Sequence, residues 1–417
     1  MARASRFLAV AACAAVWPHL VFAEVQPSVG VQPTLPGMTA QVTDVADAAD
    51  VGNAFDFNAQ VGFSRTQRNA RITRENVVNG RQQFANELSY SQVQNQLDIK
   101  AQISLYHDLE LNFYMPYIFN QDSSWGYASG VSSANSTVTT DPVTGGPLFD
   151  VPYRTYKHGL DHMDIGIAWS PFNDTRDDTK PTWTLRLTYG APIGAAYKPV
   201  KDASNPTHDA QLATAAANGR SSSQPAGLSD RTHQIKIETD LSKRFGYLEP
   251  YVAVKLTVPI VDGSGLANLA PPITGNVSSG FEIVPWENVK ERQRLSLDFR
   301  GSFSYIGPGR YYTEITDPLR QITSMENYAN FTGGFHLLLQ AVEYVRFSAG
   351  VTFGYDTAHL LTNENVGNDV NGDGVVDLND PKERNPLYNA SVDAVGHRIR
   401  VEASTVFNFY VALAITL

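Results

Sequence analysis

Strict alternation of apolar and polar residues is the feature that most constrains the fold of this 417-residue chain. In residues 54–66, AFDFNAQVGFSRT, the apolar side chains fall at every second position and polar or small ones fall between them. A period of two predicts a β-strand with two different faces. The pattern recurs at 97–105, 182–189, 294–305 and 344–356, without a helical period of comparable strength. The sequence therefore predicts an all-β protein.

The connections between these segments alternate in length. Three of them are very short, at 106–108, 244–246 and 341–343. Tight turns that alternate with large loops are typical of outer-membrane barrels, in which the turns face the periplasm and the loops face outside. The long polar stretches, which we expect to be extracellular loops, are 67–86, 120–160, 194–230, 259–277, 306–326 and 357–394.

Twelve strands account for the pattern, and an even number returns both chain ends to the periplasm. The eighth, VSSGFEIV, is included partly because parity requires it. The predicted strands are 54–66, 88–105, 109–119, 162–171, 182–192, 231–243, 247–258, 278–285, 291–305, 327–340, 344–357 and 395–417. The predicted fold is a transmembrane antiparallel up-and-down β-barrel over residues 54–417, located in the bacterial outer membrane.

A secreted β-sandwich or jelly roll is the main alternative fold, because its strands also alternate. A soluble sheet would present a polar face that resembles solvent-exposed surface. Here that face mixes small residues, Asn, Gln and paired charges, and the loops of about 30–40 residues are too long for a compact sandwich. A transmembrane helix is not expected, since no mature segment has 18 uncharged apolar residues in a row.

The first 23 residues have the features of a secretory signal peptide. Arg3 and Arg6 form a basic start, residues 7–22 are apolar, and Ala23 ends a small-residue cleavage signal. The alternative is lipoprotein acylation at Cys13. Because Cys13 is the single cysteine, cleavage after Ala23 leaves no disulfide or thiol chemistry. Loss of the two arginines takes the formal charge from −10 to −12 (−10 − 2), and an acidic exported chain argues against nucleic acid as a partner.

The two ends of the predicted barrel carry different signals. Residues 24–53 are Pro-rich and then Ala/Asp-rich, and we expect a periplasmic N-terminal segment that is either a free tail or a plug in the lumen. The C-terminal strand resembles the signal that the barrel-assembly machinery reads, which makes that machinery, outer-membrane lipid and lipopolysaccharide expected partners. Its predicted outward face holds Ile399, Val401, Ala403, Thr405, Phe407, Phe409, Val411, Leu413, Ile415 and Leu417.

The polar strand faces are expected to line the lumen, with equal numbers of both charges. The acidic candidates are Asp56, Asp98, Glu110, Asp164, Glu238, Asp240, Glu249, Asp298 and Glu402. The basic candidates are Lys100, Arg186, Lys236, Lys255, Arg294, Arg300, Arg346, Arg398 and Arg400. A ring of one sign would select ions of the other sign, so this balance predicts ion pairing across the lumen and little net selectivity. Both an open channel and a sealed barrel fit the pattern.

Three stretches resemble, in order, motifs of one protein family. They are LYHDLELNFYMPY at 105–117, GLDHMDIGIAW at 159–169 and LTYGAPIG at 187–194, a span of about a quarter of the chain. The family comprises bacterial outer-membrane barrels described as transporters of the MetA pathway of phenol degradation, loosely akin to channels for hydrophobic compounds. His162 and Met163 replace the Gly-Asp pair that is usual there. The resemblance implies a barrel fold and uptake of small hydrophobic compounds.

Residues 369–380, DVNGDGVVDLND, match the calcium loop of EF-hand and dockerin-like repeats at every ligand position. Ca²⁺ prefers oxygen ligands, and the glycine at position 6 permits the sharp turn that lets them converge. The flanks differ, because one copy is present and Pro381 ends any following helix. We therefore expect a structural Ca²⁺ site within an extracellular loop at 358–394. Its predicted ligands are Asp369, Asn371, Asp373, the Val375 carbonyl, Asp377 and Asp380.

An enzymatic function is not expected. The His-x-Ser-Asn pattern of outer-membrane phospholipases is missing from the sequence. Asp161 and His162 beside Asp164 resemble the Asp/His pairs of outer-membrane proteases, but such neighbours arise by chance among nine His and many Asp. The predicted function is a passive channel for small solutes, hydrophobic ones included, with a Ca²⁺-stabilised loop. The alternative is a structural or surface-interaction barrel whose long loops bind a protein, glycan or lipopolysaccharide.

Overall fold

The polypeptide forms an antiparallel sheet that closes on itself. The computed structural model describes residues 42–46, 56–196 (without 142, 144, 146, 147 and 150), 227–261, 268–288, 291, 293–311, 313–319, 322–342 and 344–416. The chain divides into two units, residues 1–33 and 34–417, and every described residue belongs to the second. The predicted signal peptide and most of the predicted N-terminal segment lie outside the described residues.

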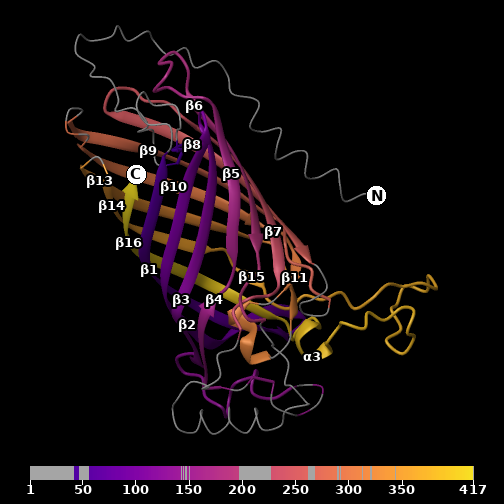
Figure 1. The fold of residues 1–417 in the computed structure, drawn as a ribbon. Helices are drawn as coiled ribbons and strands as arrows, with labels where there is room; N and C mark the ends of the chain where they lie inside the picture. Colours follow the sequence, from indigo (N-terminus) through magenta and orange to yellow (C-terminus); the bar gives the residue numbers. More distant parts are fainter. Residues whose placement is uncertain are drawn as a thin grey trace. The chain divides into compact units, whose positions relative to one another are not determined.

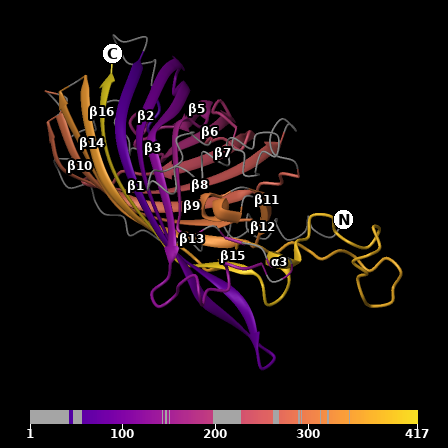
Figure 2. The same ribbon diagram turned by 90° about the horizontal axis from the view of Figure 1, so that it is seen from below.

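Twelve of the described strands form the barrel wall, each hydrogen-bonded to the next, and pairing of β1 with β16 closes the circle (Figures 1 and 2). In order they are β1 (Phe57–Val78), β2 (Arg81–Tyr106), β3 (Leu109–Tyr127), β5 (Met163–Phe172), β6 (Thr182–Ala191), β7 (Thr232–Ser242), β8 (Leu248–Val261), β9 (Thr274–Asn288), β10 (Gln293–Ile306), β13 (Tyr328–Val342), β14 (Val345–Asp356) and β16 (Ile399–Thr416). Each overlaps one predicted strand, including the eighth, which is β9. The predicted fold class is confirmed.

The outer face of the barrel is apolar and exposed. Val61, Phe353 and Leu413 are 53%, 57% and 49% accessible, respectively, although large apolar side chains of a soluble protein are normally buried. A row of Phe281, Phe299 and Phe335 crosses β9, β10 and β13, with ring centroids 5.4 and 5.1 Å apart. An apolar band around a closed barrel is the surface that contacts lipid. The chain is therefore a bacterial outer-membrane β-barrel.

Several stretches predicted as loops contain regular structure. The prediction for 67–86 is wrong, because β1 and β2 continue through it as one long hairpin with a two-residue turn at Asn79-Gly80. Both turn residues have positive φ, 52° and 75°, as Asn-Gly hairpin turns require. Other long loops hold β4 (Tyr153–Leu160), β11 (Gly309–Tyr311), the 3₁₀ helix η1 (Glu314–Leu319), β12 (Thr323–Met325), β15 (His359–Leu360) and α3 (Ala390–Asp393). No helix in the described ranges is long and apolar enough to cross a membrane.

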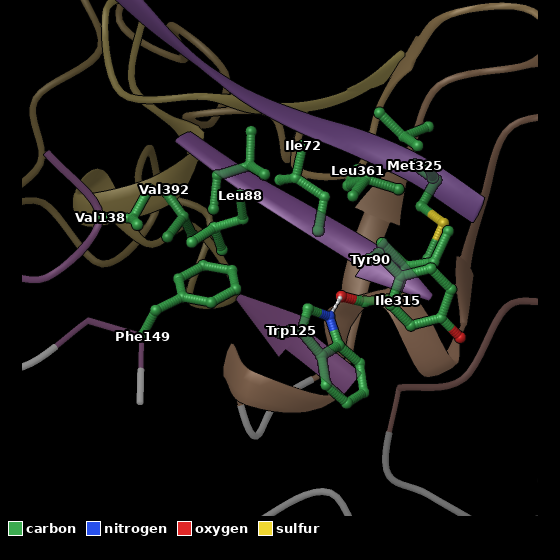
Figure 3. Close-up of a cluster of buried hydrophobic side chains, with 13 residues drawn as sticks. Ile72, Leu88, Tyr90, Trp125, Val138, Phe149, Ile315, Met325, Leu361 and Val392 are labelled. Carbon is green, nitrogen blue, oxygen red and sulfur yellow. Dashed lines mark hydrogen bonds between the residues drawn. The ribbon is translucent and has the colours of Figure 1, made fainter. Parts of the chain in front are cut away.

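The described parts of the long loops pack together over the inward-facing side chains at one end of β1, β2, β3 and β16. We call this assembly the cap (the described residues of 128–149, 309–325 and 357–398). Figure 3 shows its core, in which Trp125, Tyr90 and Ile315 lie together. The Trp125 and Tyr90 rings are 5.0 Å apart, and Trp125 Nε1 donates a 3.1 Å hydrogen bond to the Ile315 carbonyl. The remaining core residues are Ala70, Ile72, Leu88, Val138, Phe149, Met325, Leu361, Val392, Ile399 and Val401.

The first residues of β16, which lie beside the cap, do not follow the predicted outward face. Ile399 and Val401 are fully buried in the cap core, whereas Phe407 and Leu413 face outward. Ala403, at φ 48°, lies where the pairing with β1 shifts register, and such a bulge exchanges the two faces of a strand. The charged residues beside them, which were predicted to line the lumen, form ion pairs at the cap end instead. Arg398 pairs with Glu75 of β1 at 2.7 Å, and Arg400 pairs with Glu402 at 3.6 Å.

Candidate functional site

The half of the barrel nearest the short turns encloses a polar cavity of about 830 Å³. Most of the charged residues predicted for the lumen line it, contributed by eight different strands. These residues are Asp98, Glu110, Asp164, Glu238, Lys100, Arg186, Lys236, Lys255, Arg300 and Arg346. The lining also includes His162, which the sequence analysis considered only for an Asp/His pair, and Tyr114, His336 and Tyr410, which it did not identify. Asp56 is not among the lining residues.

Oppositely charged side chains of the lumen pair with each other, as the balanced composition predicted. Lys236 Nζ lies 2.6 Å from Asp164 Oδ2. Lys255 Nζ lies 3.5 Å from Glu238 Oε2. Arg186 and Asp240 form a close ion pair between β6 and β7. The Lys255–Glu238 and Arg186–Asp240 pairs join adjacent strands, and the Lys236–Asp164 pair spans β6 between β7 and β5. The pairs hold the wall together and leave little net charge to select ions.

Lys100 differs from the other lumen cations. It lines the cavity from β2, and its side chain is nonetheless exposed. Its ammonium lies 5.7 Å from the centre of the Tyr114 ring. Among the described residues no carboxylate lies within ion-pair distance of it. An inward-facing lysine that remains exposed indicates that the cavity is accessible to water.

Tyrosine hydroxyls hold several further polar groups in the lining and directly beside it. Tyr114 donates to Asp98 Oδ1 at 2.7 Å. Tyr251 donates to Asp298 Oδ1 at 2.6 Å, and Asp298 also forms a close ion pair with Arg300. The Tyr410 hydroxyl lies 2.6 Å from His336 Nδ1. These bonds satisfy groups that face the lumen and hold the aromatic rings in place.

Two predicted lumen charges are sealed within the wall. Arg294 is 1% exposed, and its Nη2 lies 2.9 Å from Glu282 Oε1 and 3.8 Å from Glu249 Oε2. None of the three residues lines the large cavity. Buried charges of this kind are held by their partners and are unavailable to solutes.

A segment near the N-terminus, residues 42–46, lies inside the barrel, and we call it the plug segment. Arg186 donates to the carbonyls of Val42 at 2.8 Å and Asp44 at 3.0 Å. Arg346 Nη1 lies 3.0 Å from Asp44 Oδ2. The Ala46 amide donates to Glu110 Oε2 at 2.8 Å. These partners come from the ends of the strands nearest the short turns, so the plug segment occupies the periplasmic side of the lumen. The rest of 24–53 is outside the described residues.

The cap bounds the other side of the lumen. Lys157 of β4 reaches Asp317 of η1 at 3.4 Å, and both side chains are almost fully buried. Burial raises the pKa of Asp317 to about 6, although the ammonium of Lys157 opposes the shift. Gln121 of β3 also donates to Glu314 of η1 at 3.3 Å. The helix η1 is thereby tied to the barrel wall by charge, hydrogen bonding and the apolar core.

The predicted calcium loop lies on the exposed surface, with its carboxylates turned toward its own backbone. Asp369 accepts hydrogen bonds from the amides of Gly372 at 2.6 Å and Gly374 at 2.7 Å, and these bonds lower its pKa. Across the described parts of the chain, no three acidic, His or Cys side chains are placed to hold a metal ion. That search does not cover an amide side chain or a backbone carbonyl, so the predicted ligand set of Asp369, Asn371, Asp373, Val375, Asp377 and Asp380 is untested, and calcium binding stays a prediction.

Glu383 is a residue of this loop that the motif did not identify. It is 3% exposed, and its carboxylate accepts from the amides of Asn371 at 3.2 Å and Asp377 at 2.8 Å. A single buried carboxylate thus connects both halves of the 369–380 turn. The signal was present in the sequence only as an acidic residue three positions beyond the motif.

Asp161 and His162 lie at the junction of β4 and β5, and His162 faces the cavity. His162 Nδ1 is 3.0 Å from Asp161 Oδ2, and its Nε2 is 4.0 Å from Asp164 Oδ2. Asp164 is already engaged by Lys236. Asp164, the carboxylate that would complete the Asp/His arrangement, is therefore held in a structural ion pair with Lys236.

Comparison with known proteins shows similarity at the level of structure alone. No family model matches the chain, and no curated protein does. The chain is similar to an outer membrane channel from Pseudomonas putida F1, with 9% identity, 86% of this chain and 95% of that chain covered, and a TM-score of 0.41. It is also similar to a Pseudomonas aeruginosa FadL homologue (10% identity, 87% and 90% covered, TM-score 0.33). The outer membrane protease OmpT from Escherichia coli also matches (9% identity, 87% and 97% covered, TM-score 0.29).

Proposed function

We propose that this barrel is an outer-membrane channel for the passive passage of small solutes. The observation that carries the proposal is the water-accessible cavity of about 830 Å³, lined by paired charges and by the exposed Lys100. A barrel that served only as a scaffold could fill this space with packed side chains, as small barrels do. The lining is dominated by charged, amide and hydroxyl groups, which favours polar or amphipathic solutes over purely hydrophobic ones.

Passage requires the plug segment to move, because its backbone is bonded to Arg186 inside the lumen. The Asp44–Arg346 ion pair is the contact that can be removed with least harm to the wall, since it joins the plug segment to β14. Both side chains are 19% exposed, so we expect the pair to contribute about 1 kcal/mol to the closed arrangement.

Single-channel recording in planar bilayers tests this proposal. Asp44→Asn should raise the open fraction about fivefold, which corresponds to about 1 kcal/mol. Replacement of residues 42–46 by a Gly-Ser sequence of equal length should give the largest open-state current. Asp177→Asn is the matched control, because Asp177 pairs with Lys180 in a turn outside the lumen. Silence of all four folded proteins, wild type included, would refute a channel.

We also propose that the chain is not an enzyme. Asp164, the carboxylate nearest to an Asp/His arrangement, is bound by Lys236. The C-terminal strand β16, which pairs with β1 to close the barrel, is the segment that we propose is read by the barrel-assembly machinery. The short motifs at 105–117, 159–169 and 187–194 support membership of the phenol-degradation transporter family as a proposal, and uptake of hydrophobic compounds depends on that membership.

We propose, finally, that residues 369–380 bind Ca²⁺ and stiffen the exposed loop. Support comes from the complete ligand pattern and from Gly372 and Gly374, whose φ values of 78° and 88° give the tight turn that such loops need. Binding requires Asp369 to exchange its backbone hydrogen bonds for the ion. Calorimetry on wild type and on Asp369→Ala with Asp373→Ala tests this. Loop cleavage by protease that is identical with and without chelator would contradict it.

A further inference from the structure

The outer wall of the barrel changes from apolar to polar between the apolar band and the cap, on the side formed by β1 to β4. On β1 the outward residue Phe63 is followed, two positions along, by Arg65 and later by Arg71, and both arginines are exposed. The outward positions of β2 and β3 change in the same direction, from Leu97 and Tyr117 to Ser91 and Ser124. The wall formed by β1 to β4 is therefore polar where it rises above the apolar band.

This polar wall is hollowed into a trough of about 560 Å³. Two rows of paired residues line most of it, and Ala70, Tyr90, Trp125, Pro152 and Ala403 complete the lining. In the first row Asn69, Ser91, Ser124 and Arg154 are direct neighbours across β1, β2, β3 and β4. In the second row Arg71, Ser89 and Gly126 are neighbours in the same way. Serine and glycine make a low floor, and the long side chains of Arg71 and Arg154 stand at opposite sides of it.

The arginines of the trough carry charge that the described protein does not neutralise. Arg65, Arg71 and Arg154 have no carboxylate within ion-pair distance among the described residues, and Arg65 donates only to Asn95, at 3.3 Å. The nearest carboxylate in register is Glu402, opposite Arg71, and it pairs with Arg400 at 3.6 Å. Asp122 of β3 accepts from Asn120. A basic cluster on a chain of net charge −10 indicates an anionic ligand.

The height of the trough places it at the level of lipid headgroups. On the neighbouring strand β16 the outward Phe407 is paired with Gln67 and is 48% exposed, so the apolar band reaches to within two residues of Asn69, about 7 Å along a strand. Headgroups of the outer leaflet extend about 5–8 Å beyond the hydrocarbon. A phosphorylated sugar headgroup offers phosphate oxygens, which guanidinium groups bind in bidentate pairs, and also hydroxyls that can pair with Asn69 and the serines of the floor.

We propose that this trough binds the phosphorylated sugar headgroup of lipopolysaccharide. Arg71 and Arg154 hold phosphate groups on either side of the floor, Asn69 and the serines donate to sugar hydroxyls, and Arg65 contacts phosphate closer to the membrane. The site is independent of the lumen, so it stands whether or not the barrel conducts. It would anchor the wall beneath the cap in the outer leaflet.

The test measures binding of rough lipopolysaccharide with a phosphorylated core to the purified full-length protein in detergent, by native mass spectrometry. Arg71→Gln with Arg154→Gln should weaken binding at least tenfold. Lys382→Gln with Arg384→Gln is the matched control, since it removes two exposed charges from the 366–385 loop and should leave binding unchanged. Heat-modified migration on gels confirms that each variant is folded.

Three further ligands decide the chemistry. The same lipopolysaccharide after enzymatic dephosphorylation should bind as weakly as the double variant binds the intact form, and inorganic phosphate alone should bind weakly to both proteins. Phosphatidylglycerol vesicles should not compete. Equal binding of the dephosphorylated form, equal loss in the control variant, or full competition by phosphatidylglycerol would each overturn the assignment.

Discussion

Inward-facing side chains of the same strands have opposite environments at the two ends of this barrel. On β2, Asp98 and Lys100 line a water-accessible cavity, whereas Leu88 and Tyr90, on the same face of the same strand, are packed in the dry core of the cap. On β1, Gln60 and Ser64 give way in the same manner to Ile72. Strand alternation therefore separates the inside of the barrel from the outside, but it does not specify whether the inside holds water or packed side chains.

The two ends also differ in what holds them together. The cap depends mainly on apolar packing, which fails when a cavity is made. The lumen depends on ion pairs such as Lys236–Asp164 and on tyrosine–carboxylate bonds, which keep polar groups satisfied beside water. Substitutions and pH distinguish the apolar core of the cap from the charged lining of the lumen.

Trp125→Ala should open the cap and leave the lumen intact. Trp125 is 1% exposed and holds both Tyr90 and η1, and its truncation should destabilise the cap by about 3–5 kcal/mol. Limited proteolysis at 128–149 and 309–325 should accelerate strongly. Trp169→Ala is the control, because Trp169 is 49% exposed on the outer wall. Unchanged cleavage in Trp125→Ala would show that the cap does not rest on this core.

Acidification should strengthen the cap. The pKa of Asp317 is raised to about 6 from an ordinary value of 3.8, so the folded cap binds a proton more tightly than the unfolded loop does. Stability therefore rises as pH falls from about 6 to about 4, by up to about 2 kcal/mol. Proteolysis with an acid-tolerant protease should slow over this range in wild type and not in Asp317→Asn. The same pH response in both proteins would contradict this origin.

Lys100→Glu should alter ion selectivity with little effect on stability. Lys100 is exposed to the lumen, and reversing its charge changes the energy of a passing ion by about 2 kcal/mol at 4 Å in water, enough for about a thirtyfold shift toward cations. Reversal potentials in a KCl gradient measure the ratio. Lys382→Glu, in an exposed loop, should leave it unchanged. A marked loss of stability would mean that the lumen is drier at Lys100 than its exposure indicates.

Sequence reasoning located all twelve strands because a lipid-facing wall requires period-two alternation in every strand. The prediction was wrong where a turn motif or a β-bulge, rather than alternation, determined the structure. The prediction of a loop at 67–86 overlooked the Asn-Gly turn at 79–80, and the continuous face of β16 overlooked the bulge at Ala403. A one-residue bulge leaves no mark on composition, yet it turns Ile399 and Val401 inward.

The sequence by itself determined the barrel, the inward and outward faces over most of each strand, and the balanced charge of the lumen. These properties are local, since each depends on the spacing of residues within one strand. Only the tertiary structure decided that residues 42–46 enter the lumen, that the long loops form a cap around Trp125, and that Arg71 and Arg154 flank one trough. Those contacts join segments far apart in the chain, and closure of the barrel is what brings them together.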